Sequence, residues 1–140
     1  TEESYTGQVR NTFVAGTFNK FDEYDVTELP NVADVTALDI WLDGEQFSLD
    51  KGTFMNYSRT LNLKTGEVTR LFDWTNRAGK SFTFVFKKMV SLADLHTLAL
   101  HVSITPQTHP AQIEIQSGIN GQVSNSGAQH FHEGEKRIFD

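Results

Sequence analysis

The chain has 140 residues, and its 12 Lys and Arg against 18 Asp and Glu give a formal net charge of −6 at pH 7. Its basic residues are scattered, whereas proteins that bind nucleic acid without sequence preference concentrate them to neutralise phosphates. We therefore exclude nucleic acid as a partner. Hydrophobic residues make up 38% of the chain and 11 residues are Phe, which is typical of one globular domain with an aromatic core.

The absence of cysteine limits the kinds of covalent and metal site that the chain can form, and it indicates the cellular compartment. Without cysteine, the chain can form neither a disulfide nor a thiolate metal site, and a reducing compartment is favoured. No apolar run approaches the roughly 20 residues that a membrane-spanning helix needs. We expect a soluble protein with a cytoplasmic location and no membrane partner. The chain also begins without Met, and we interpret it as a piece of a longer protein.

Apolar and polar residues alternate along most of the chain, a pattern typical of half-buried β-strands. In chain order, the first predicted strand spans Val9 to Phe18. The acidic segment Asp22 to Pro30 is predicted to be a loop. Asp43-Gly44 then separates two short runs, Asp39 to Leu42 and Gln46 to Leu49, which should pair. This dipeptide is a strong hairpin signal because both residues of a type I′ turn need positive φ.

Two further turns are predicted in the middle of the chain. Lys64 to Glu67 forms the first, with Gly66 in the left-handed position, and Asn76 to Gly79 forms the second. The strand between them places Val68, Arg70, Phe72 and Trp74 on one face. Because side chains alternate with period two in a strand, Phe82, Phe84 and Phe86 must also share a face. This pattern argues against a helix through Ser81 to Val90.

The remaining segments continue the same pattern. Leu98 to Ile104 predicts a long strand, and Ile113 with Ile115 predicts another before Gly118 to Gly121 turns the chain. Roughly seven to nine short strands without intervening helices indicate an antiparallel sandwich. The predicted fold class is therefore all-β, with residues 1–140 forming a single β-sandwich domain or a fragment of one.

Three residues near the end of the chain are candidate metal ligands. His130, His132 and Glu133 could place two imidazoles on one side of a strand, a geometry that metals use. The other histidines, His96, His101 and His109, stand at irregular distances from this group. We therefore expect no bound metal here.

The segment Asp22 to Glu28 also contains Glu23 and Asp25, and two of these carboxylates could form a pair for acid and base catalysis. Acid and base catalysis by two carboxylates requires unequal burial, which separates their pKa values. A polar loop that ends at Pro30 is more often solvated on both sides. We therefore favour a solvated loop over a catalytic pair.

A sugar-binding platform is a further possibility, since the faces of aromatic side chains suit the apolar side of a pyranose ring. Trp41, Trp74, Tyr24 and Tyr57 are the candidates. Trp74 is in phase with Phe72 and is predicted to be buried. Trp41 is out of phase with its apolar neighbours and is the better candidate for an exposed side chain.

Several ordered segments go beyond this general class. They are Glu2-Glu3 with Tyr5-Thr6-Gly7, FVAGTFNK (13–20), LPNVADVTALDIWLDGEQFSL (29–49), YSRTLNLKTGEVTRLFDW (57–74), VSLADLH (90–96) and INGQVSN (119–125). Together they resemble the N-terminal β-sandwich domain of glycoside hydrolase family 65, the maltose, trehalose and kojibiose phosphorylases. The ending NSGAQHFHEGEKRIFD (125–140) looks most like the maltose phosphorylase type.

The resemblance implies both a parent activity and a noncatalytic role for this chain. The parent would be an inverting phosphorylase, with glycosyltransferase activity, that converts an α-glucosidic disaccharide and inorganic phosphate to β-glucose 1-phosphate and glucose without a cofactor. The family's catalytic (α/α)6 barrel lies later and is absent here. No catalytic, cofactor-binding or metal residue is therefore assigned, and Glu28, Asp39 and Asp43 are given no such role.

The resemblance also implies partners and leaves one alternative. This chain would be part of a larger super-sandwich that packs on the catalytic domain of the same polypeptide and supports a homo-oligomer. The loop Asp22 to Asp34 is the expected contact with the catalytic domain, because its length and acidity are not needed to join two strands. The isolated piece is expected to self-associate through a sheet edge or an uncovered face. The alternative is an autonomous carbohydrate-binding module. The disaccharide preference is not determined by these residues.

Overall fold

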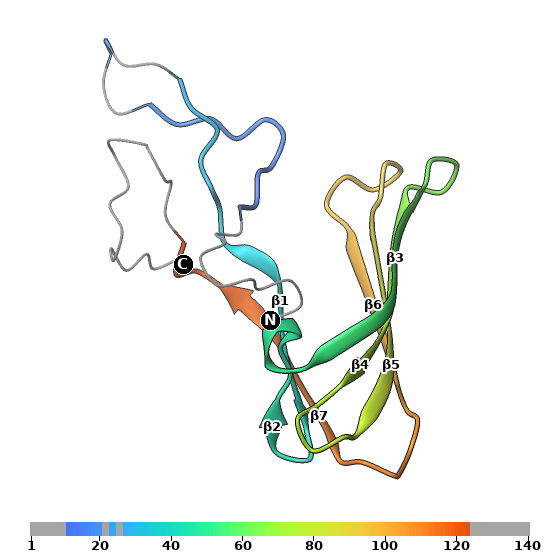
Figure 1. Ribbon diagram of the computed structural model, residues 1–140. Helices are drawn as coiled ribbons and strands as arrows, with labels where there is room; N and C mark the ends of the chain where they lie inside the picture. Colours follow the sequence, from blue (N-terminus) through green and yellow to red (C-terminus); the bar gives the residue numbers. More distant parts are fainter. Residues whose placement is uncertain (1–10, 21–22, 25–26, 124–140) are drawn as a thin grey trace. The chain divides into compact units, whose positions relative to one another are not determined.

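The computed structural model describes residues 11–20, 23–24 and 27–123. They fall into two compact units, and the first comprises residues 39–115 of the described part. Within the described ranges the regular elements are seven strands and one 3-10 turn (Figure 1). They are β1 (Asp34–Leu42), β2 (Glu45–Gln46), the 3-10 turn η1 (Leu49–Lys51), β3 (Thr53–Asn62), β4 (Glu67–Thr75), β5 (Ser81–Val90), β6 (Leu98–Pro106) and β7 (Ile113–Asn120).

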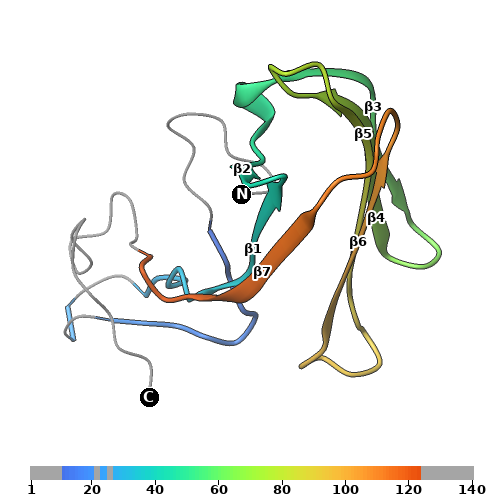
Figure 2. The same ribbon diagram turned by 90° about the horizontal axis from the view of Figure 1, so that it is seen from below.

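The strands form two sheets, and the all-β, antiparallel sandwich prediction is confirmed. One sheet has the order β3-β4-β5-β6, an antiparallel meander whose strands lie side by side in Figures 1 and 2. The other has the order β2-β1-β7. Ser81 to Val90 is the strand β5 and not a helix, because alternating Phe residues can bury one face of a strand but not one face of a helix.

The three predicted turns are confirmed by their backbone conformation. Asp43 (φ 52°) and Gly44 (φ 82°) both have the positive φ of a type I′ turn between β1 and β2. Gly66 (φ 71°) lies in the turn between β3 and β4, and Gly79 (φ 80°) in the turn between β4 and β5. The pairing predicted for the first hairpin is shorter than expected. The strand register covers Trp41↔Gln46 and Leu42↔Glu45, a backbone bond from Phe47 N to Ile40 O (2.8 Å) follows it, and η1 begins at Leu49.

The core of the first unit is aromatic, as the alternation predicted. Trp74, Phe72, Phe82, Phe84 and Phe86 come from β4 and β5, and each is at most 3% exposed. Phe47, just after β2, stacks on Phe84 with ring centroids 4.4 Å apart and meets Trp74 edge-on at 5.1 Å. Such offset and edge-to-face contacts are the favourable arrangements of aromatic rings. The segment after β2 is thereby fixed to the four-stranded sheet.

Two predictions about secondary structure are wrong in the described part. Residues 11–18 of the predicted strand Val9 to Phe18 are not a strand, because Gly16 (φ 88°) and the bond from Thr17 N to Val14 O (3.1 Å) turn the chain. Gly118 to Gly121 is not a turn, since β7 runs through Asn120. Pairing in the sheet there overrides the turn preference of glycine.

The acidic segment before β1 is irregular, as predicted. Residues 23–24 form a turn, and Asn19 and Glu28 form an isolated antiparallel bridge with two backbone bonds of 2.9 Å. Nearby, Asn31 is 1% exposed and its Oδ1 accepts a bond from Thr12 N at 2.7 Å. Asp22 and Asp25 lie outside the described residues.

Candidate functional site

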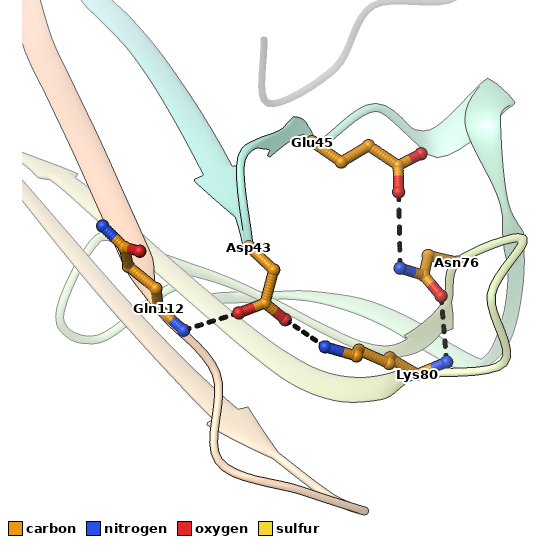
Figure 3. Close-up of polar contacts among 5 residues, drawn as sticks. All are labelled: Asp43, Glu45, Asn76, Lys80 and Gln112. Carbon is orange, nitrogen blue, oxygen red and sulfur yellow. Dashed lines mark hydrogen bonds and ion pairs between the residues drawn. The ribbon is translucent and has the colours of Figure 1, made fainter.

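A group of polar contacts in the first unit lies where three turns meet (Figure 3). Asp43, in the β1–β2 turn, accepts a bond from Lys80 Nζ at 2.6 Å and one from the backbone N of Gln112 at 2.8 Å. Asn76, in the β4–β5 turn, donates to Glu45 at 3.3 Å and accepts from Lys80 N at 2.9 Å. We call these five residues the turn cluster.

The turn cluster is suited to holding backbone segments together and not to proton transfer. The hydrogen bond from Lys80, followed by that from Gln112, lowers the pKa of Asp43 below its ordinary value. A carboxyl group that must donate a proton to a leaving group needs a raised pKa. The geometry therefore gives Asp43 a structural role, in which its carboxylate links the β1–β2 turn to Lys80 and to the backbone of Gln112.

Sequence reasoning missed this cluster because its members are far apart in the chain. Asp43 and Gln112 are 69 positions apart, and Asp43 and Lys80 are 37 apart. The Asp43-Gly44 signal located the turn correctly, but nothing in the local pattern indicates which distant groups the carboxylate binds. Only the closing of the sandwich brings them together.

The four-stranded sheet has two chemically different faces. Residues directly opposite on neighbouring strands share a face, so the register places Phe72 and Phe84 on what we call the inner face. The outer face carries the acidic side chains of these strands. There Asp73 accepts bonds from Thr83 (2.5 Å) and Asn56 (2.6 Å), and Glu67 pairs with Lys87 (3.2 Å).

We expect these outer-face carboxylates to make the stability of the fold sensitive to acid, because their hydrogen bonds lower their pKa values. The hydrogen bond from Thr83, then that from Asn56, lowers the pKa of Asp73 below its ordinary value of 3.8. A carboxyl group whose pKa is lowered by folding stabilises the folded state at pH values above its ordinary pKa. This stabilisation is lost as the pH falls from the ordinary pKa to the lower pKa of the folded state.

We predict that Asp73→Asn lowers the urea midpoint at about pH 6 and that the difference from the unmodified chain shrinks below about pH 3.5. The difference begins to shrink as the pH falls below the ordinary value of 3.8, and it disappears once the folded carboxyl group is protonated and has lost the charge that the amide lacks. Urea unfolding at several pH values measures this. Asp39→Asn serves as a comparison on another strand, and a difference for Asp73→Asn that is independent of pH would contradict the prediction.

A shallow pocket lies beside η1. Its lining residues are Asp50, Lys51, Gly52, Thr53, Thr75, Asn76 and Arg77, and its volume is about 220 Å³. Pockets that bind small molecules usually have about 300–1,000 Å³, so this one is below the range for a disaccharide. Gly52 packs closely against Trp74, whose indole Nε1 is buried without a hydrogen-bond partner in the described part of the chain.

The aromatic platform considered from the sequence is not assembled. Trp74 is 1% exposed, as its phase predicted, and belongs to the core. Tyr57 is 42% exposed, but its ring stacks on Phe72 with centroids 6.0 Å apart. Trp41 is half-buried, and Tyr24 is 95% exposed. Exposed aromatic side chains therefore remain, but not as one stacking surface made from these four residues.

The other candidate ligands and acids are only partly described. His130, His132 and Glu133 lie outside the described residues, and among the described residues no group of three His, Asp or Glu is placed to hold a metal ion. Of the acidic segment, Glu23 is exposed and Glu28 is half-buried, with its Oε2 buried and without a hydrogen-bond partner in the described ranges. Within residues 11–123, as far as they are described, no helix is long and apolar enough to cross a membrane.

Comparison with known proteins places these observations in a family. Residues 1–140 match the family model described as "Glycosyl hydrolase family 65, N-terminal domain". A kojibiose phosphorylase of Halothermothrix orenii is 45% identical over 138 residues, which cover 99% of this chain and 18% of the relative. A kojibiose phosphorylase of Escherichia coli is 33% identical over 138 residues, with the same shares of both chains.

Another relative has a different disaccharide in its name. An α,α-trehalose phosphorylase of Thermoanaerobacter brockii is 33% identical over 139 residues, covering 89% of this chain and 18% of the relative. The chain thus spans about a fifth of the length of the curated relatives that it matches. These relatives do not support the assignment to the maltose phosphorylase type that residues 125–140 had favoured.

Proposed function

The chain belongs to the N-terminal domains of glycosyl hydrolase family 65, and from this membership we propose that it is the noncatalytic N-terminal domain of a disaccharide phosphorylase. The observation that carries the proposal is that residues 1–140 match the family model, while 99% and 89% of the chain cover only 18% of relatives named kojibiose phosphorylase and α,α-trehalose phosphorylase. The proposed parent transfers a glucosyl group from an α-glucosidic disaccharide to phosphate, giving β-glucose 1-phosphate and glucose.

The electrostatics of the described carboxylates support a noncatalytic role. In an inverting reaction, one protein acid protonates the leaving oxygen, while phosphate replaces the activated water of a hydrolase. Such an acid needs a raised pKa. Hydrogen bonds lower the pKa of every described carboxyl group with a resolved shift, and these groups are Asp43, Asp50, Glu67, Asp73 and Asp94.

We predict that the purified 140-residue chain releases no glucose 1-phosphate from kojibiose, trehalose or maltose in phosphate buffer. The full-length natural protein should release it from at least one of them, and the preferred disaccharide identifies the parent type. Coupled assay of glucose 1-phosphate measures both preparations. Turnover by the isolated chain, abolished by Glu28→Gln, would overturn the proposal. Disaccharide binding by the isolated chain, lost in Trp41→Ala, would indicate the alternative, a carbohydrate-binding module.

The second unit supports the packing role that we propose for the segment Asp22 to Asp34. Within the segment, Tyr24 (95%) and Leu29 (48%) are exposed, and the described residues before it expose Phe13 (56%) and Phe18 (65%). Exposed apolar groups of this size mark interaction sites when they are numerous. We assign them to contact with the catalytic domain of the same polypeptide, in a protein that we place in the cytoplasm.

The isolated chain also has open sheet edges. In the described part, β3 pairs only with β4, and all ten of its residues are exposed. Unpaired backbone groups on a long edge strand are templates for pairing with another chain. We predict self-association at micromolar concentration, measured by sedimentation velocity. Replacing Thr60 on this edge by Pro should reduce it, and a monomer at every concentration would contradict the prediction.

A further inference from the structure

Within the described ranges, five leucine and valine side chains are exposed at one end of the four-stranded sheet. Because Val68 of β4 lies opposite Lys88 of β5, the β3–β4 turn and the β5–β6 turn share the end of the sheet that lies away from η1 (Figures 1 and 2). The exposed side chains there are Leu61 (56%), Leu63 (88%), Val90 (61%), Leu92 (89%) and Leu95 (73%). We call these five residues the apolar end, and all of them belong to the first unit.

The loop between β5 and β6 is held in shape by its own hydrogen bonds. A bond from Ser91 N to Thr97 O (3.0 Å) closes it. Asp94 binds across the loop, because its N donates to Ser91 Oγ (2.9 Å) and its carboxylate accepts bonds from His96 N (3.2 Å) and Thr97 Oγ1 (2.5 Å). These polar groups are bonded within the loop, while its two leucines are exposed. A preformed loop loses little conformational entropy on binding, so its leucines are suited to anchor a contact.

The apolar end has the size of an interaction surface. Each of its side chains offers about 100 Å² for burial, so the five together offer about 500 Å². The largest apolar patch of a typical monomer measures about 300–600 Å² and often has a function. Two copies that cover each other's apolar ends would bury about 1,000 Å² in total, which reaches the area that a specific protein–protein contact needs.

A second copy of the chain fits this surface because a two-fold contact lets each copy supply both sides. In such a contact, residue i of one copy meets residue j of the other, and j meets i. The two loop leucines of one copy then pack on Leu61 and Val90 of the other, and the reverse contact forms at the same time. Lys64, in the β3–β4 turn, and Asp94, in the β5–β6 loop, have opposite charges. An arrangement that brings these two different turns together therefore places unlike charges near each other.

We propose that two copies of the chain dock through their apolar ends, with Leu92 and Leu95 of each copy packed on Leu61 and Val90 of the other. This contact differs from pairing at the edge of β3. Edge pairing uses backbone groups and can continue from chain to chain, whereas a two-fold contact closes at a dimer. The proposal uses only the surface of the first unit, so it does not depend on the phosphorylase assignment.

Sedimentation velocity of Thr60→Pro chains tests the dimer, because proline at this position blocks pairing at the edge of β3. These chains should form a discrete dimer. Adding Leu92→Asp with Leu95→Asp should weaken it about 100-fold or more, since each buried leucine contributes about tenfold or more to the association constant. Ile119→Asp is the matched control, because Ile119 is as exposed as Leu95, at 73%, but lies on β7. A monomer in Thr60→Pro alone, or an equal loss in both variants, would overturn the proposal.

A spin label tests the contact directly, since the chain has no cysteine and one introduced cysteine accepts one label. Spin-labelled Ala93→Cys chains are mixed with isotope-labelled chains that carry no spin label, so only contacts between copies are detected. The amide signals of Leu61 and Val90 should broaden. A label on Thr105→Cys, on the outer face of β6 near the opposite end of the sheet, should leave them sharp. Sharp signals with both labels would contradict the contact, and the amide spectrum shows whether each variant remains folded.

A later part of the parent polypeptide is the other occupant that these experiments can reveal. In that case no broadening between copies would occur in the isolated chain. Leu92→Asp with Leu95→Asp would then destabilise the full-length protein and leave the isolated chain unchanged. This result would overturn the contact between two copies, and it would leave the phosphorylase assignment intact.

Discussion

Phe84→Ala is expected to destabilise the chain by about 3–5 kcal/mol, the range for removing a large aromatic side chain from a packed core. Phe84 has no exposed surface, and its ring lies 4.4 Å from that of Phe47 and 5.2 Å from that of Phe72. It therefore joins the segment after β2 to the four-stranded sheet. A loss of this size is a large share of the roughly 5–15 kcal/mol that stabilises most domains.

Urea unfolding followed by circular dichroism measures this loss, and Phe54→Ala is a matched control. Phe54 lies on the edge strand β3 and is 44% exposed, so part of its side chain is already in water and less transfer free energy is lost. The two substitutions remove the same atoms, and only burial separates them. Equal losses would mean that Phe84 is not at the centre of the core.

The sequence predicted the turns and the alternating strands of the meander accurately because their signals are local. Three turns carried residues with the required backbone preference, and the Phe residues of β5 alternated without interruption. Each signal extends over a few residues and is reinforced by the next. The all-β fold class and its hairpins could therefore be predicted. The burial of Trp74 could also be predicted, because Trp74 lies two residues after Phe72 and so on the same face of the strand.

The failures also have a physical cause. Val9 to Phe18 alternates like a strand, but Gly16 at φ 88° turns the chain, and propensity alone did not reveal that. Glycine is typical of turns, but Gly118 lies in β7, where hydrogen bonding to the neighbouring strand determines its conformation. The turn cluster joins residues from turns that are far apart in the chain. It cannot be found from spacing along the sequence, because it forms only when the strands on either side of these turns have paired.

Gly52→Ala is expected to destabilise the chain by about 1–3 kcal/mol or more, as overpacking of a close contact does. A Cβ atom at this position would overlap the carbonyl oxygen of Thr75 and lie 2.6 Å from Nε1 of Trp74. The backbone itself is extended there, with φ −149°, so alanine meets no conformational strain and only the steric overlap acts. Gly118→Ala is the control, since open space surrounds its Cβ position, and it should change stability by less than about 0.5 kcal/mol. Urea unfolding of the two variants compares them directly, and equal stabilities would show that the contact between Gly52 and Trp74 is not tight.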